Sequence, residues 1–200
     1  VVWKRERNQP ACRPRACSEN PAANVLTGGA GDDTYLLDAG DRVLENAGEG
    51  VDEVQIISGA TQAYALDMYA NVENLTLGEG LSASALTGSG GDNTLRGNTY
   101  GNVLTGGAGN DTLYGGDGSD TYVFGPGSGQ DLVSDGGGTS SYYDTIQFTS
   151  GVLPGDVLLS RIDDDLQLSV AGATDQVTVQ NHFTTYGRIE RMLFADGTVW

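Results

Sequence analysis

The sequence predicts an all-β fold, a parallel β-solenoid whose coils each contribute short strands. Two nonapeptides follow one another without a gap from Gly106 to Val123, and read G-G-A-G-N-D-T-L-Y and G-G-D-G-S-D-T-Y-V. A third copy, G-G-A-G-D-D-T-Y-L, runs from Gly28 to Leu36. Apolar residues also recur at intervals near nine over much of the chain, whereas a 3.6-residue helical period is absent there. A short fixed repeat of this kind is typical of a solenoid rather than of a globular core.

The apolar positions of this ladder are expected to point into the solenoid, one from each strand. Their spacing is nine residues through most of the two blocks, with ten residues before Val54 and a two-residue insertion before Val133. The ladder consists of Leu26, Tyr35, Leu44, Val54, Leu75, Leu86, Leu95, Leu104, Leu113, Tyr122 and Val133.

Each nonapeptide divides into a six-residue turn, G-G-x-G-x-D, and a three-residue strand. Glycine suits positions where φ is positive or where the backbone must approach an ion closely. A glycine-rich turn leaves its carbonyl oxygens unobstructed, and the aspartate adds a carboxylate. Calcium takes six to eight oxygen ligands of these two kinds, so the spacing indicates calcium-binding turns.

The pattern G-G-x-G-x-D-x-U-x, in which U is apolar, resembles the calcium-binding repeat of RTX (repeats-in-toxin) proteins. The resemblance implies a right-handed parallel β-roll in which two nonapeptides make one coil. Turns n and n+2 would then stack on the same edge, with a calcium ion between them. It also implies type I secretion of an unfolded chain, C-terminus first, into the extracellular medium.

Stacking turn n on turn n+2 predicts which side chains meet. Asp33 and Asp52 are 19 residues apart, close to the 18 of one coil. Asn93 and Asn102 take the place of the aspartate in two turns and offer only neutral oxygens, so we expect weak calcium binding there or none. The predicted pairs are Asp33 with Asp52, Asn93 with Asp111, Asn102 with Asp120, Asp111 with Asp131 and, as a further pairing, Asp120 with Asp144.

The aspartates that carry the strict motif are the strongest candidates, above all the edge that joins Asp111 to Asp131. The predicted calcium-site residues are Gly28, Gly29, Gly31, Asp33, Gly48, Gly50, Asp52, Asn93, Asn102, Gly106, Gly107, Gly109, Asp111, Gly115, Gly116, Gly118, Asp120, Gly127, Gly129, Asp131 and Asp144. A solvated acidic surface on a disordered linker is the alternative, but a random linker would not hold Asp, Thr and an apolar residue in a nine-residue frame.

Composition and charge narrow the classes of partner. Glycine makes up 31 of the 200 residues, and the net charge is −17. Residues 1–17 carry +4, so the remaining 183 carry −21. That charge argues against nucleic acid or an anionic membrane as the partner of the main body, and suits a protein that binds cations. No apolar run is long enough for a transmembrane helix, and the N-terminus lacks the apolar stretch of a signal peptide.

The sequence divides into three segments. A Pro- and Arg-rich tail, in which Cys12 and Cys17 have no expected functional role, precedes the repeats. After the repeats, glycine becomes less frequent, and strands in which apolar and polar residues alternate are expected. They include a hairpin with the acidic turn Asp163–Asp165. The predicted segments are a disordered tail or linker over 1–21, a β-roll over 22–141 with calcium blocks at 28–54 and 88–133, and a β-rich cap over 142–200.

The last segment resembles the haemolysin-type calcium-binding-related domain that follows such repeats. The resemblance rests on the pieces L-P-G-D, D-D-D-L and R-I-E-R…F-A-D-G-T-V-W. We expect the segment to pack on the end of the roll, and we expect a longer parent protein because the sequence stops on a strand. The residues available for a small core of its own are Phe148, Leu158, Leu166, Leu168, Phe183, Leu193 and Phe194.

No catalytic function is predicted. His182 is the single histidine, and neither G-x-S-x-G nor H-E-x-x-H occurs. Adjacent carboxylates in the turn Asp163–Asp165 are expected to be solvated rather than to act as glycosidase acids. The first functional hypothesis is a calcium-binding folding and secretion module of a larger exported bacterial protein.

Two alternatives stay open. One is an adhesive or carbohydrate-binding module, in which the calcium-stiffened roll displays aromatic side chains to an extracellular polysaccharide. The candidate aromatics are Tyr100, Tyr114, Tyr142 and Tyr143. The other is an accessory fragment of a secreted lipase, protease or epimerase.

Overall fold

A computed structural model describes residues 4–5, 23–38, 40–59, 63–82, 85–136, 142–184 and 188–200. Of the predicted tail it describes only the two-residue strand β1 (Lys4–Arg5), so Cys12 and Cys17 lie outside the described residues. The described part is β throughout, apart from two short 3-10 helices, η1 (Leu66–Met68) and η2 (Pro154–Asp156). The predicted all-β parallel solenoid is confirmed.

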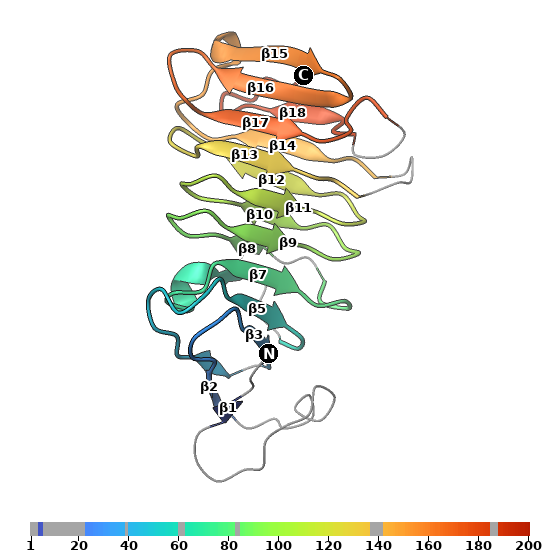
Figure 1. Ribbon diagram of the computed structural model, residues 1–200. Helices are drawn as coiled ribbons and strands as arrows, with labels where there is room; N and C mark the ends of the chain where they lie inside the picture. Colours follow the sequence, from blue (N-terminus) through green and yellow to red (C-terminus); the bar gives the residue numbers. More distant parts are fainter. Residues whose placement is uncertain are drawn as a thin grey trace.

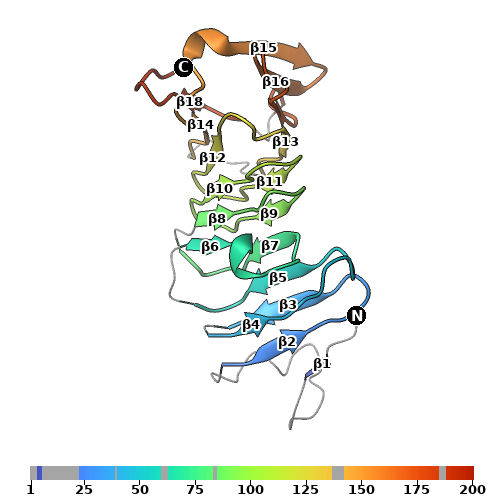
Figure 2. The same ribbon diagram turned by 90° about the vertical axis from the view of Figure 1, so that its left-hand side faces the viewer.

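Two long sheets face each other across the molecule, and successive repeats alternate between them (Figures 1 and 2). One sheet has nine described strands, in the order β15 (Val157–Ile162), β16 (Asp165–Val170), β17 (Gln176–Val179), β13 (Gln130–Val133), β11 (Thr112–Tyr114), β9 (Thr94–Arg96), β7 (Asn74–Leu77), β5 (Glu53–Ile56) and β3 (Thr34–Leu37). The other has six, in the order β18 (Arg191–Leu193), β14 (Thr145–Phe148), β12 (Thr121–Phe124), β10 (Val103–Thr105), β8 (Ala85–Thr87) and β6 (Ala63–Ala65).

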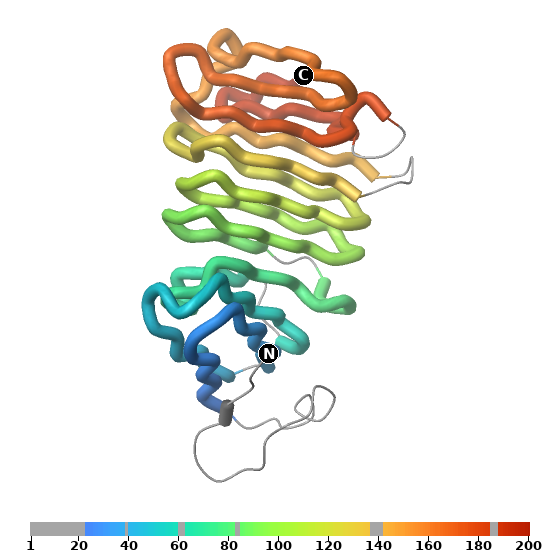
Figure 3. The backbone as a smooth tube through the Cα atoms, viewed as in Figure 1, coloured from blue at the N-terminus to red at the C-terminus, as the bar shows by residue number. Residues whose placement is uncertain are grey.

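Parallel pairing holds the coils in register. β10 pairs with β8 and β12, and β11 pairs with β9 and β13, so equivalent residues of successive coils lie side by side. The backbone tube shows the flat coils of this region, from green through yellow, stacked one on another (Figure 3). Antiparallel pairing among the described strands occurs only at the two ends, between β15, β16 and β17 and between β1 and β2 (Val25–Thr27).

The interior consists of the apolar ladder. Leu104, for example, lies between Leu86 and Tyr122 on the neighbouring strands, and all three are fully buried. Leu26 packs against the core while remaining partly exposed. The ladder residues that are buried as predicted are Tyr35, Val54, Leu75, Leu86, Leu95, Leu104, Leu113, Tyr122 and Val133.

Leu44 is the exception, and its predicted place in the ladder is wrong. Its side chain is 61% exposed, whereas its neighbour Val43 packs against the core. Strand β4 (Arg42–Val43) pairs with β2 so that Val43 lies beside Leu26. The spacing from Leu26 to Val43 is one residue shorter than the two nonapeptides of one coil. A one-residue shift of this kind sends a strand's side chains to the opposite face.

The C-terminal segment extends both sheets of the roll rather than building a separate one. β14 and β18 continue the six-stranded sheet, and β17 continues the nine-stranded sheet by pairing with β13. Phe148 and Phe194 stack at 5.0 Å between ring centres and join the same core cluster as the ladder. Leu166 and Leu168 are also buried in this cluster, whereas Leu158 and Phe183, expected to contribute to a core, are exposed. The hairpin of β15 and β16 closes this end, at the top of Figure 1.

Candidate calcium sites

The conformation of the repeat turn requires glycine for two separate reasons. In the repeat 115–123 the glycines at the second and fourth positions, Gly116 and Gly118, have φ of 101° and 113°, a region that side-chain-bearing residues rarely adopt. The first glycine, Gly115, does not have a positive φ. There a side chain would collide with the Asp120 carboxylate and the Tyr122 hydroxyl. The turn therefore folds its own aspartate back over its first glycine.

A column of carboxylates lies along one edge of the roll. These carboxylates belong to residues at the start of strands in the nine-stranded sheet. The main-chain N–H of Asp33 donates to Asp52 Oδ1 at 2.9 Å, across one coil. In the second block, Asn93 N–H donates to Asp111 Oδ1 at 2.8 Å, and Asp111 N–H donates to Asp131 Oδ1 at 2.9 Å. Each aspartate thus accepts, through one carboxylate oxygen, a hydrogen bond from a main-chain N–H group in the turn of the preceding coil.

The opposite edge repeats the arrangement. Asn102 N–H donates to Asp120 Oδ1, and Asp120 N–H donates to Asp144 Oδ1, both at 2.7 Å. All five side-chain pairs predicted from the stacking of alternate turns are therefore brought together, including the pair formed by Asp144, which lies outside any recognisable repeat.

Three acidic residues that the sequence analysis missed extend these columns. Glu73 Oε2 accepts from Asp52 N–H, and Glu190 Oε2 accepts from Asp144 N–H, both at 2.8 Å. The two glutamates share an apolar–Glu–x–apolar pattern at the start of their strands. The pattern reads V-E-N-L around Glu73 and I-E-R-M around Glu190. Asp175 accepts from the main-chain N–H groups of Gly127 and Gly129 at 2.9 and 3.1 Å, and no repeat motif marks it.

Buried carboxylate oxygens mark the places where a cation fits. Asp52, Asp111 and Asp120 are at most 1% exposed. In each of them Oδ2 is buried and has no hydrogen-bond partner within the described structure. An uncompensated buried charge is costly, and hard oxygen donors of this kind are the ligands that calcium prefers. The residues present therefore fit calcium.

Burial also changes the acidity of these groups. It raises the pKa of Asp111 to about 6, and that of Asp120 and Asp131 to about 7, against the ordinary 3.8. It raises the pKa of Asp144 to about 8, with further contributions from the neighbouring Asp135 and Asp120 carboxylates. The metal-free protein therefore holds these groups partly protonated near neutral pH, and a bound cation would have to displace those protons.

The side-chain oxygens of Asn93 and Asn102 accept hydrogen bonds within their own turns. Asn93 Oδ1 accepts from Ser89 N–H at 2.6 Å, and Asn102 Oδ1 accepts from Asn98 N–H at 2.8 Å. These bonds close the turn within one repeat and leave the amide oxygen engaged. Their geometry supports the expectation of weak calcium binding at these positions.

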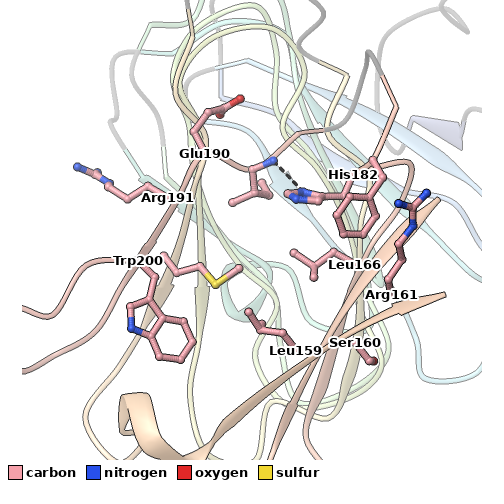
Figure 4. Close-up of a pocket in the computed structure, with 11 residues that line it drawn as sticks. Leu159, Ser160, Arg161, Leu166, His182, Glu190, Arg191 and Trp200 are labelled. Carbon is pink, nitrogen blue, oxygen red and sulfur yellow. Dashed lines mark hydrogen bonds between the residues drawn. The ribbon is translucent and has the colours of Figure 1, made fainter. Parts of the chain in front are cut away.

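A cleft lies at the C-terminal end, where Glu190 belongs to its lining. It has a volume of about 430 Å³ and a mostly apolar lining that includes Leu159, His182 and Trp200 (Figure 4). His182 Nδ1 accepts a hydrogen bond from the main-chain N–H of Ile189 at 3.3 Å, and burial lowers the His182 pKa. The imidazole is therefore a packed, neutral group. Asp163 and Asp164 lie exposed in the hairpin turn, as expected of solvated acids.

Fold and site together define a calcium-binding β-roll, and comparison with known families agrees. The model of the RTX calcium-binding nonapeptide repeat (4 copies) matches residues 21–44 and 87–122. The model of the haemolysin-type calcium binding protein related domain matches residues 165–200. A search of the curated proteins found no match. The chain thus carries RTX calcium-binding nonapeptide repeats and, at its C-terminal end, a haemolysin-type calcium binding protein related domain, and the repeats indicate Ca²⁺ as its ligand.

Repeats of this class are typically non-catalytic and occur in exported bacterial proteins. None of the helices among the described residues has the length and hydrophobicity to cross a bilayer.

Proposed function

We propose that this chain is a folding and secretion module whose roll forms when calcium binds between its stacked turns. The observation that carries the proposal is the pair of carboxylate columns, in which buried Oδ2 atoms of Asp52, Asp111 and Asp120 have no hydrogen-bond partner in the described structure. In this proposal the aspartates of adjacent turns supply the charged ligands, and the glycine turns supply carbonyl oxygens. The roll spans 22–141, and residues 142–200 cap it.

The energetic argument is that the roll needs its ions. Each nonapeptide buries essentially one apolar side chain, yet the backbone of all nine residues must be ordered. Without calcium, the columns place carboxylates against one another in a buried environment. A cation turns that repulsion into attraction, so that its binding free energy contributes directly to folding.

Such a protein would remain unfolded where calcium is scarce and fold where it is abundant. Extracellular calcium modules have dissociation constants of about 10⁻⁴–10⁻³ M, far above the calcium level of a cytoplasm. We infer export of the unfolded chain by a type I secretion system, as part of a larger bacterial protein, followed by folding outside the cell. The tail over 1–21 would then be a linker to the preceding region.

Far-UV circular dichroism of the 200-residue chain tests this proposal. The expected result is a largely disordered spectrum in chelator and a β spectrum in millimolar-range calcium. Magnesium at the same concentration controls for ionic strength and should not restore the β spectrum. A chain that is fully β in chelator, with no change on adding calcium, would contradict the proposal.

An adhesive role is the second candidate, and one observation favours it. Tyr100 and Tyr143 are exposed, and both lie beside Ser119 at one edge of the roll. Gly101 packs against the Ser119 carbonyl, and Tyr143 N–H donates to Ser119 Oγ at 3.0 Å. Retention on neutral and acidic polysaccharide columns tests the role. A Tyr100→Ala/Tyr143→Ala variant should lose any retention while folding normally with calcium, and a wild-type chain that is not retained would exclude this role.

A further inference from the structure

Two residues of the interior ladder carry a hydroxyl group, and both occupy the same position in their repeats. Tyr35 and Tyr122 each follow the motif aspartate by two residues, in the sequence D-T-Y. The Tyr35 hydroxyl donates to Glu45 Oε2, and the Tyr122 hydroxyl donates to Asp135 Oδ1 at 2.9 Å. All four side chains lie in buried residues. A buried tyrosine thus holds a buried carboxylate in each block.

Each tyrosine-held carboxylate lies within a cluster of three. One oxygen from each of Asp33, Glu45 and Asp52 lies within 4.8 Å of the other two, and all three residues are buried. The same holds for Asp120, Asp135 and Asp144. Glu45 and Asp135 lie outside the nonapeptide motif, in the segments that follow β4 and β13.

The two clusters share their whole surroundings. In each, the first glycine of the repeat is crowded by the motif carboxylate and the tyrosine hydroxyl. In each, a glutamate from the next coil caps the second aspartate. The chain therefore builds one arrangement twice, from Gly28, Asp33, Tyr35, Glu45, Asp52 and Glu73, and again from Gly115, Asp120, Tyr122, Asp135, Asp144 and Glu190.

We propose that Glu45 and Asp135 are additional calcium ligands, each completing a three-carboxylate site that a tyrosine hydroxyl positions. The proposal rests on the function proposed above, because it adds ligands to sites between stacked turns. The observation that points to a cation is the buried Oδ2 of Asp52 and of Asp120, which has no hydrogen-bond partner among the described residues. Within those residues no lysine or arginine pairs with the acids of the first cluster.

The spacing of the oxygens suits calcium. Two ligands on one ion at 2.3–2.6 Å lie at most about 5 Å apart, and the clustered oxygens satisfy that limit. Three carboxylates also bring more charge than two, which strengthens calcium binding. The repeat that holds Asp111 has Leu113 at the tyrosine position, and no third carboxylate joins Asp111 and Asp131 in the described clusters. Its site is therefore the weaker one.

Calcium titration by isothermal calorimetry tests the proposal on the 200-residue chain. Glu45→Gln and Asp135→Asn should each remove one tight ion or weaken its binding by about tenfold or more, and the double variant should lose both. Asp164→Asn, which removes an exposed acid, should match the wild type. A double variant that binds as many ions as the wild type, with unchanged affinities, would overturn the proposal.

Terbium luminescence excited through tyrosine supplies a second readout that leaves every carboxylate in place. Because Tyr35 and Tyr122 contact the proposed ligands, Tyr35→Phe and Tyr122→Phe should each reduce sensitised terbium emission, and calcium should compete for the signal. Tyr114→Phe is the matched control. Unchanged emission in both variants would contradict the proposal. A wild-type chain that binds calcium alongside unaffected variants would refute this inference alone, whereas a wild-type chain that binds no calcium would refute the proposed function as well.

Discussion

The main-chain N–H of Asp120 donates a 2.7 Å hydrogen bond to the carboxylate of Asp144, 24 residues further along the chain. Asp120 belongs to a complete repeat, whereas Asp144 opens the C-terminal segment. The bond has the same form as the one between Asp111 and Asp131 within the roll. The C-terminal segment therefore continues the carboxylate column as well as the sheets, and Glu190 extends it one coil further.

Replacing the motif aspartates should impair calcium-driven folding more than replacing the asparagines in equivalent positions. Asp111→Ala and Asp120→Ala each remove a buried carboxylate, so the calcium midpoint of folding should rise by about tenfold or more. Asn93→Ala and Asn102→Ala remove hydrogen bonds of a neutral amide, including the one from Asn93 Nδ2–H to the Glu73 carbonyl, each worth about 1 kcal/mol, and should shift the midpoint much less. Circular dichroism during calcium titration measures all four, and equal shifts would refute the ranking.

The first glycine of the repeat should not tolerate a methyl group. Gly115→Ala would drive the new side chain into the Asp120 carboxylate and the Tyr122 hydroxyl, and overpacking of this kind costs about 1–3 kcal/mol. Denaturant unfolding in saturating calcium measures the loss. Gly90→Ala is the control, because a methyl group there has no neighbour within 4 Å. An equal effect at both positions would contradict the predicted crowding.

The metal-free protein should become less stable as the pH rises. Burial places the pKa values of Asp111, Asp120, Asp131 and Asp144 at about 6, 7, 7 and 8, above the ordinary 3.8. The folded state therefore binds more protons than the unfolded state between about pH 4 and pH 8, and its stability falls across that window. Circular dichroism in chelator should show the residual fraction of folded chain decreasing from about pH 5 to about pH 8.

Calcium should reverse that trend, because protons compete with the ion for the same carboxylates. The gain in β signal on adding calcium should grow as the pH rises over the same range. A metal-free protein that is more stable at pH 8 than at pH 5 would show that the carboxylates are not buried in their protonated form.

Removing the C-terminal segment should raise the calcium concentration needed for folding. A chain of residues 22–134 loses Asp135 and Asp144, and with them the partner of the Asp120 N–H group. It also exposes the edges of both sheets where β14 and β17 pair. Calcium titration of residues 22–134 beside residues 22–200 measures the difference. Folding of both at the same calcium concentration would show that the segment neither caps nor nucleates the roll.

The repeats made most of the fold predictable, because a nine-residue frame fixes strand spacing and inward positions together. The stacking of alternate turns was enough to predict the pairing of Asp33 with Asp52, and even that of Asp120 with Asp144. Leu44 was placed wrongly because the register near β4 is one residue shorter than the frame. Regular spacing predicts the average coil and carries no information about a local shift.

The acids outside the repeats were not predictable in the same way. Glu45 and Asp135 come from connecting segments of different length, 10 and 13 residues after their tyrosines. Nothing in their local sequence marks them as buried. The shared V-E-N-L and I-E-R-M pieces could have indicated Glu73 and Glu190, since both repeat an apolar–Glu–x–apolar pattern at the start of a strand.

The most direct test of calcium binding between stacked turns is an anomalous difference map from crystals grown in calcium. The account predicts peaks beside the carboxylates of Asp33 and Asp52, of Asp111 and Asp131, and of Asp120 and Asp144. Each ion should have carboxylate and main-chain carbonyl oxygens at about 2.3–2.6 Å. A map with no peak at any of these three places, or with peaks only at exposed acids such as those of the turn Asp163–Asp165, would contradict it.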